Sequence, residues 1–77
     1  MEELLVSIAS GLVQNPDEVR VTADQPNEEG VIVLHLSVAE GDMGRVIGKQ
    51  GRIAKAIRTV MRAAANKADM NVAVEID

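Results

Sequence analysis

Apolar residues recur at helical spacing in two parts of the chain. In residues 2–14 these positions are Leu4, Leu5, Ile8, Leu12 and Val13. Because Pro16 restricts the backbone of Asn15, we expect this helix to end near Gln14. A second pattern covers residues 52–68, with an apolar arc made of Ile53, Ile57, Val60, Met61 and Ala64. Cations fall roughly opposite that arc, at Arg52, Lys55, Arg58 and Arg62. The second pattern therefore predicts an amphipathic helix.

Three other segments alternate between apolar and polar residues, which is typical of strands with one buried face. In residues 18–24 the apolar side consists of Val19, Val21 and Ala23. In residues 31–38 the better core face is Ile32, Leu34, Leu36 and Val38, and the other face carries Val31, Val33, His35 and Ser37. Near the end of the chain, Val72, Val74 and Ile76 alternate with Ala73, Glu75 and Asp77. The turn-forming stretch QPNEEG joins the first two segments, so they are predicted to form an antiparallel hairpin.

The stretch AEGDMGRVIG interrupts the strand pattern. It predicts a short helix over residues 43–47, with Asp42 as its N-cap, and a turn from Gly48 to Gly51. The resulting order is α-β-β-α-α-β, in which the second and third strands are expected to pair in parallel through a right-handed crossover. We therefore expect an α+β fold of two layers, with a three-stranded mixed sheet and helices on one face. A single domain would span residues 1–77.

Charge is distributed very unevenly along this acidic chain, whose net charge is −4. Seven of the eight cations lie between Arg45 and Lys67, and no acid falls among them, so this segment carries +7. The remaining residues hold one cation and twelve acids and carry −11. Since local potential decides where a polyanion docks, the basic segment favours a polyanionic partner despite the negative total.

Composition narrows the chemistry further. The chain has no cysteine and a single histidine, His35, so we expect neither a disulfide nor a metal site. It has no aromatic residue, which excludes base stacking on Phe, Tyr or Trp. No apolar run is long enough for a membrane span, and the N-terminal segment carries acids where a signal peptide needs cations. We expect a soluble, cytoplasmic protein with no cofactor and no membrane partner.

Three phosphate-binding motifs compete for the turn Gly48-Lys49-Gln50-Gly51. The P-loop requires G-x-x-x-x-G-K-[ST], but Gly44 and Gly48 enclose three residues, and Gln50 stands where Ser or Thr is needed. The dinucleotide fingerprint requires G-x-G-x-x-G, but residue 46 is valine. No hydroxyl residue has a general base at a recognisable spacing either. An enzyme with catalytic residues or a small-molecule substrate is therefore not expected.

The third motif is a G-x-x-G clamp between two helices. Its two glycines allow a tight turn and the close approach of a sugar-phosphate backbone. The N-terminus of the following helix favours an anion. Lys49 in the turn, Arg45 before it and Arg52 after it would add positive charge.

The stretch VIGKQGRIAKAI resembles the core of a K-homology (KH) domain, with its V-I-G-x-x-G signature. The element order resembles the type II, bacterial arrangement, and a whole chain of one such domain resembles the KhpA family of stand-alone RNA-binding proteins. This resemblance implies that Gly48, Lys49, Gln50 and Gly51 hold the backbone of about four nucleotides of single-stranded RNA. It also implies an aliphatic groove for unstacked bases beside the second strand, lined by Val46, Ile47 and Ile53. Lys55, on the basic side of the predicted helix, is a further candidate for contact with the RNA.

Two functions follow as alternatives. The first is non-catalytic RNA binding, with a role as an RNA chaperone or post-transcriptional regulator. In many KH loops both middle residues are cations, and here Gln50 replaces one of them. The second is a protein-interaction module, in which the basic helix docks an acidic partner. The family also implies pairing with a second copy, or with the larger KH-containing protein KhpB (Jag).

Overall fold

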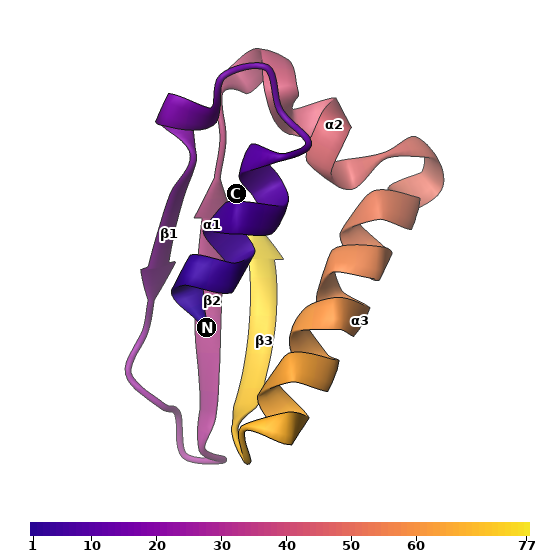
Figure 1. The fold of residues 1–77 in the computed structure, drawn as a ribbon. Coiled ribbons are helices and arrows are strands. Elements are labelled where there is room, and N and C mark those ends of the chain that lie inside the picture. The colour runs from indigo at the N-terminus through magenta and orange to yellow at the C-terminus, as the bar shows by residue number, and fades with distance from the viewer.

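The computed structural model describes residues 1–77 as one sheet with helices packed against it. Strands β1 (Arg20–Ala23), β2 (Val31–Ser37) and β3 (Asn71–Ile76) lie in the order β1-β2-β3, with β1 antiparallel and β3 parallel to β2. The helices are α1 (Glu2–Ser10), α2 (Met43–Ile47) and α3 (Arg52–Lys67). Figure 1 shows α1 lying across the sheet and α3 running alongside β3. The predicted element order and mixed sheet are confirmed.

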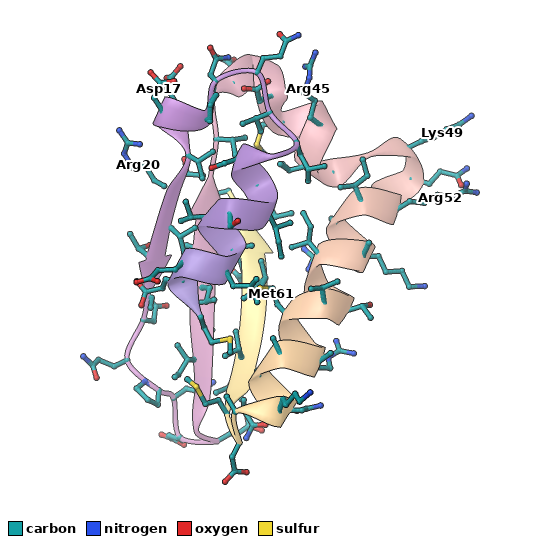
Figure 2. The ribbon with its side chains drawn as sticks, in the orientation of Figure 1. Asp17, Arg20, Arg45, Lys49, Arg52 and Met61 are labelled. Carbon is teal, nitrogen blue, oxygen red and sulfur yellow. The ribbon has the colours of Figure 1, made fainter.

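The core lies between one face of this sheet and the helices. It joins Leu5 and Ala9 of α1, Ile57 and Met61 of α3, Val46 of α2, and Val19, Leu34, Leu36 and Val74 of the sheet layer. Figure 2 shows Met61 reaching from α3 toward the sheet. The predicted core face of β2 is confirmed, because Leu34 and Leu36 are buried and Ile32 and Val38 pack against them. The opposite face of the sheet has no helix over it.

The buried stripe of α3 differs from the predicted arc. Val60 belongs to the predicted apolar arc, but it is 48% exposed and does not join the core. The buried positions are Ala54, Ile57, Met61 and Ala65, which recur at spacings of three and four. Alanine is only weakly hydrophobic, so the sequence pattern does not mark Ala54 and Ala65 as buried. It marks the more hydrophobic Val60 instead, which lies at the edge of this stripe.

Helix α1 ends at Ser10, four residues before the predicted end near Gln14. The main chain leaves the helix at Gly11, whose N–H donates to the Ser7 carbonyl at 3.3 Å. Gln14 and Asn15 then donate their main-chain N–H groups to the carboxylate of Asp42 rather than to helical carbonyls. A 3₁₀ turn at Pro16–Glu18, which the sequence did not predict, leads into β1.

Asp42 occupies the predicted N-cap position of α2, but its side chain makes no capping hydrogen bond there and serves as a tertiary anchor instead. Its side chain is 1% exposed and accepts hydrogen bonds from Gln14 N at 3.1 Å, Asn15 N at 3.0 Å and Asn15 Nδ2 at 3.1 Å. Burial alone would raise the pKa of Asp42, but these bonds and the nearby Arg45 charge together lower it below the ordinary value. The anchor ties the linker after α1 to the start of α2.

None of the three α-helices combines the length and the apolar character that crossing a bilayer requires.

Candidate nucleic-acid interface

The turn between α2 and α3 has an unusual backbone. Gly48, Gln50 and Gly51 have φ values of 76°, 58° and 74°, which lie in the region that L-residues rarely adopt. The Gly48 N–H donates to the Gly44 carbonyl at 2.9 Å, which ends α2, and the Gly51 N–H donates to the Gly48 carbonyl at 3.1 Å. The predicted turn from Gly48 to Gly51 is confirmed.

The two glycines are required for different reasons. A Cβ atom at Gly48 would lie 2.6 Å from Cγ1 and 2.9 Å from Cβ of Ile53, so the absent side chain lets Ile53 pack beneath the turn. A Cβ atom at Gly51 would meet no other atom within 4 Å. Gly48 thus serves internal packing, whereas Gly51 leaves open space where an external backbone can come close.

The electrostatics at this turn are positive. Gly51 is the N-cap of the 16-residue helix α3, with no side chain capping it and no acid in the first turn. The helix dipole is therefore not offset locally. Lys49 and Arg52 are exposed, and neither forms an ion pair. Figure 2 shows both side chains extending from the turn into solvent. An anion at the turn would meet two free cations and a helix N-terminus.

Arg45 differs from the other two predicted cations. Its guanidinium donates to the Gly41 carbonyl at 3.3 Å and lies 3.6 Å from Asp42. Figure 2 shows its side chain leaving the molecule in a different direction from Lys49 and Arg52. The charge of Arg45 is thus partly offset by the buried Asp42. Lys55 is exposed on α3, three residues beyond Arg52 and therefore on nearly the same side of the helix.

The structure places the three residues predicted for the aliphatic groove in different surroundings. Val46 is 0% exposed and belongs to the core, so it cannot contact a base. The second strand is the central one, and helices cover its apolar face. Ile53 instead lines a shallow apolar hollow between α1 and α3, together with Ile8, Leu12, Arg52, Ala56, Ile57 and Val60. Ile47 is 37% exposed and remains available at the end of α2.

A second hollow, which was not predicted from the sequence, lies between α3 and the free edge of β3. It is lined by Arg58, Arg62, Val72, Ala73, Val74 and Glu75. The Nε of Arg58 donates to the Val74 carbonyl at 3.2 Å. The basic periodicity of α3 was visible in the sequence, but its position beside an edge strand depends on the sheet order. This hollow therefore combines two arginines with an unpaired strand edge.

Comparison with known proteins agrees with this geometry. The family model described as "KhpA/KhpB, KH domain" matches residues 2–76. The chain is 58% identical to the RNA-binding protein KhpA of Clostridium acetobutylicum, with 99% of each chain covered. It is 46% identical to the RNA-binding protein KhpA of Bacillus subtilis, over 99% of this chain and 91% of the relative.

The solved structures show the same fold in a larger protein. A crystal structure of an Era variant from Aquifex aeolicus, bound to GDP and AlF4−, matches with a TM-score of 0.66 at 21% identity. The match covers 97% of this chain and 28% of the Era chain, so it concerns the fold of one part of that protein. The full-length match to the family model and the identities to its curated members lead to one conclusion: the chain belongs to the KhpA/KhpB family of KH domains.

Proposed function

We propose that this protein binds single-stranded RNA without catalysing a reaction, and that the RNA backbone lies on the turn from Gly48 to Gly51. The observation that supports this most strongly is at Gly51. Its φ of 74° lies in the left-handed region that glycine adopts most readily, nothing lies within 4 Å of where its side chain would be, and it begins α3 beside two free cations. A phosphate there would gain hydrogen bonds and charge without a steric clash. The relatives named RNA-binding protein KhpA support the same ligand class.

The contacts proposed for the bases follow from what remains exposed near α3. Ile47 and Ile53 supply aliphatic surface, and Arg52 and Lys55 supply charge along the first turns of α3. Arg58 and Arg62, beside the free edge of β3, extend the basic surface to further nucleotides. Few of these side chains can read base edges by hydrogen bonding, so sequence preference is proposed to be modest. Such binding suits an RNA chaperone or post-transcriptional regulator in the cytoplasm.

A second candidate function is protein pairing. Its support is the apolar hollow between α1 and α3, whose rim includes Leu12 at 38% and Val60 at 48% exposure. Exposed apolar patches of this kind mark interaction sites. A second copy of the chain and the larger KhpB protein are the proposed partners, and the family description names KhpA and KhpB together. The hollow shares Arg52 and Ile53 with the proposed RNA surface, so a partner seated there would compete with base contacts at these two residues and leave the open side of Gly51 accessible.

The RNA proposal is tested by a charge change in the turn. The variant Lys49→Asp with Gln50→Asp is titrated with a mixed-sequence single-stranded RNA at two salt concentrations. The matched control is Asn66→Asp with Lys67→Asp, which changes the net charge by the same −3 at the far end of α3. We expect the parent and the control to bind in a salt-dependent manner and the turn variant to lose binding with an unchanged circular dichroism spectrum. Equal loss in both variants, or no binding by the parent at low salt, would contradict the proposal.

A further inference from the structure

The face of the sheet that points away from the helices has a cluster of polar groups at its centre. On β2, His35 lies between Leu34 and Leu36, which both face the core, so its side chain is on the open face. Its cross-strand neighbours are Thr22 on β1 and Glu75 on β3. Asp24 and Asp77 follow the ends of those two strands, and the N–H of Asp77 donates to the Leu36 carbonyl at 2.9 Å, which fixes its backbone. Strand pairing therefore brings three carboxylates to one histidine.

The two ring nitrogens of His35 have different partners. Nε2 lies 2.9 Å from Oδ2 of Asp24. Nδ1 lies 3.4 Å from a carboxylate oxygen of Asp77 and 3.9 Å from one of Glu75. When Nε2 carries the proton of the neutral ring, it donates to Asp24, and the lone pair of Nδ1 then points toward two negative carboxylates. Three electron-pair donors then converge on one point, so the space beside Nδ1 favours a positive charge there, either the second proton of the ring or a metal ion that replaces it.

No other charged group on this face can supply that cation. Arg20 is on the same face of β1, but its guanidinium donates to the carbonyls of Asp17 at 2.7 Å and Val19 at 2.9 Å. No lysine lies on β1, β2 or β3. Glu75 and Asp77 therefore have His35 as their only nearby cationic partner, and a metal ion at Nδ1 would take the place of its proton.

We propose that His35, Glu75 and Asp77 form a binding site for a divalent transition-metal cation, with Zn²⁺ as the best fit. The ligand atoms of the three residues all lie within 4.8 Å of one another. Ligands bound to tetrahedral Zn²⁺ at about 2.0–2.1 Å are about 3.4 Å apart, close to the separations of Nδ1 from the two carboxylates. Asp24 orients the ring from its other nitrogen, as carboxylates commonly do for metal-binding histidines.

The mixed ligand set predicts selectivity. One imidazole nitrogen with two carboxylates suits Zn²⁺ and its neighbours, whereas Mg²⁺ and Ca²⁺ prefer oxygen ligands alone. One histidine and no cysteine predict no metal site from composition alone. The parallel pairing of β2 with β3 changes this expectation, because it brings Glu75 beside His35 across 40 residues of chain. The composition also simplifies the test, because no thiol and no second histidine compete for the metal.

The experiment is a titration of the purified full chain with Zn²⁺ near neutral pH. Calorimetry measures stoichiometry, and nitrogen-15 NMR of the imidazole reports the only histidine ring. We expect saturable binding of one Zn²⁺ per chain, with a shift of the Nδ1 resonance and no comparable response to equimolar Mg²⁺. The affinity should fall at least tenfold in His35→Gln and in Glu75→Gln. It should be unchanged in Glu28→Gln, a matched change in the hairpin loop.

Several results would overturn the proposal. One is a Zn²⁺ isotherm that does not saturate, and another is equal binding by His35→Gln and the parent. A third is an Nδ1 signal that responds to pH alone, since a proton would then be the cation that this cluster holds. The site is independent of the proposed RNA interface, so His35→Gln should retain the RNA affinity of the parent. A loss of RNA binding in the turn variant alone would therefore not bear on the metal site.

Discussion

At the scale of single residues, the two glycines of the G-x-x-G pattern have different roles. Gly48 is needed for packing inside the protein, and Gly51 leaves space outside it. Gly48 combines a φ of 76° with a ψ of 173°, a region that is essentially restricted to glycine, and its missing side chain leaves room for Ile53. Gly51 adopts the left-handed helical region, with φ of 74° and ψ of 16°, and faces open space. Substitution should therefore separate structural from ligand-binding effects.

We predict that Gly48→Ala lowers the free energy of unfolding by about 3 kcal/mol, because backbone strain and a clash with Ile53 act together. Gly51→Ala should lower it by only about 1 kcal/mol, the cost of a left-handed conformation in an L-residue. Urea unfolding of both variants measures the difference. Equal destabilisation would mean that the packing of Ile53 against Gly48 does not matter.

The pH dependence of stability should depend on His35. The hydrogen bond to Asp24 is the largest cause of its raised pKa, desolvation opposes it, and the charges of Asp24, Asp77 and Glu75 add to it. A raised pKa in the folded state means that the native protein holds this proton more tightly. The resulting stability is fully present below the ordinary pKa of 6.5 and is lost as pH rises through the folded-state value.

We therefore predict that the Tm, measured with a chelator present, rises as pH falls from about 9 to about 6. In His35→Gln, the Tm should change much less over the same range. A parent protein whose Tm is flat across this range would contradict the assigned surroundings of His35. Below this range the Asp42 carboxylate acts in the opposite direction. Its pKa is lowered, so its contribution is present above the ordinary value of 3.8 and is lost as acid protonates it.

At the scale of elements, α3 has three functional sides. Its buried stripe, centred on Ile57 and Met61, holds it to the sheet, its exposed cations lie beside the turn and β3, and Val60 borders the apolar hollow next to α1. Adjacent residues of α3 therefore differ strongly in how much they contribute to the stability of the fold. This division explains how one amphipathic helix can serve the core and two surfaces at once.

Met61 and Val60 are adjacent on α3, and the cost of truncating each one compares its buried side with its exposed side. Met61 is 0% exposed, so Met61→Ala should lower the free energy of unfolding by about 2–5 kcal/mol through lost burial and a cavity. Val60→Ala should change it by less than about 0.5 kcal/mol, as expected for an exposed position. Chemical denaturation tests both values. If Val60→Ala proved as costly as Met61→Ala, the exposed position of Val60 would have to be abandoned.

The sequence predicted the elements with the strongest local signals. The core face of β2 and the limits of α2 followed from alternation and from the glycines around residues 43–48. The features that it missed depend on contacts between distant segments. Asp42 stands at the N-cap position of α2, but its carboxylate accepts hydrogen bonds from Gln14 and Asn15 instead of from the helix. These two residues accordingly lie outside α1. Local periodicity cannot show which face of α3 meets β3, or that Glu75 pairs with His35.

The features of the candidate site likewise fall into those that the sequence predicts and those that depend on tertiary packing. The spacing of Gly48 and Gly51 and the surrounding cations could be recognised from sequence, and the structure places Lys49 and Arg52 together at the turn. The burial of Val46 and the engagement of Arg45 with Asp42 could not be recognised, because both depend on how α2 packs. The hollow at the edge of β3 required the strand order.

At the scale of the whole molecule, the charge is separated between surfaces. The basic segment follows the turn and α3, while Asp24, Glu75 and Asp77 gather on the open face of the sheet. An acidic protein can therefore attract RNA at one surface and a metal cation at another. The net charge of −4 predicts neither interaction.

This separation has a measurable consequence for salt dependence. If Lys49, Arg52 and Lys55 each neutralise one phosphate, a plot of log affinity against log salt concentration should have a slope of about −2 for single-stranded RNA. Replacing Lys55 by Gln should reduce the slope by about 0.7. A slope near zero would show that phosphate contacts do not drive binding.

The most direct test of the central claim is to map the RNA contact on the backbone. Proton–nitrogen NMR spectra are recorded while single-stranded RNA is added to the protein. We predict that the amides of Gly48, Lys49, Gln50, Gly51 and Arg52 shift most, with smaller changes along the exposed side of α3. Shifts confined to the apolar hollow around Leu12 and Val60, with the turn unaffected, would contradict the account and favour protein pairing as the function of this surface.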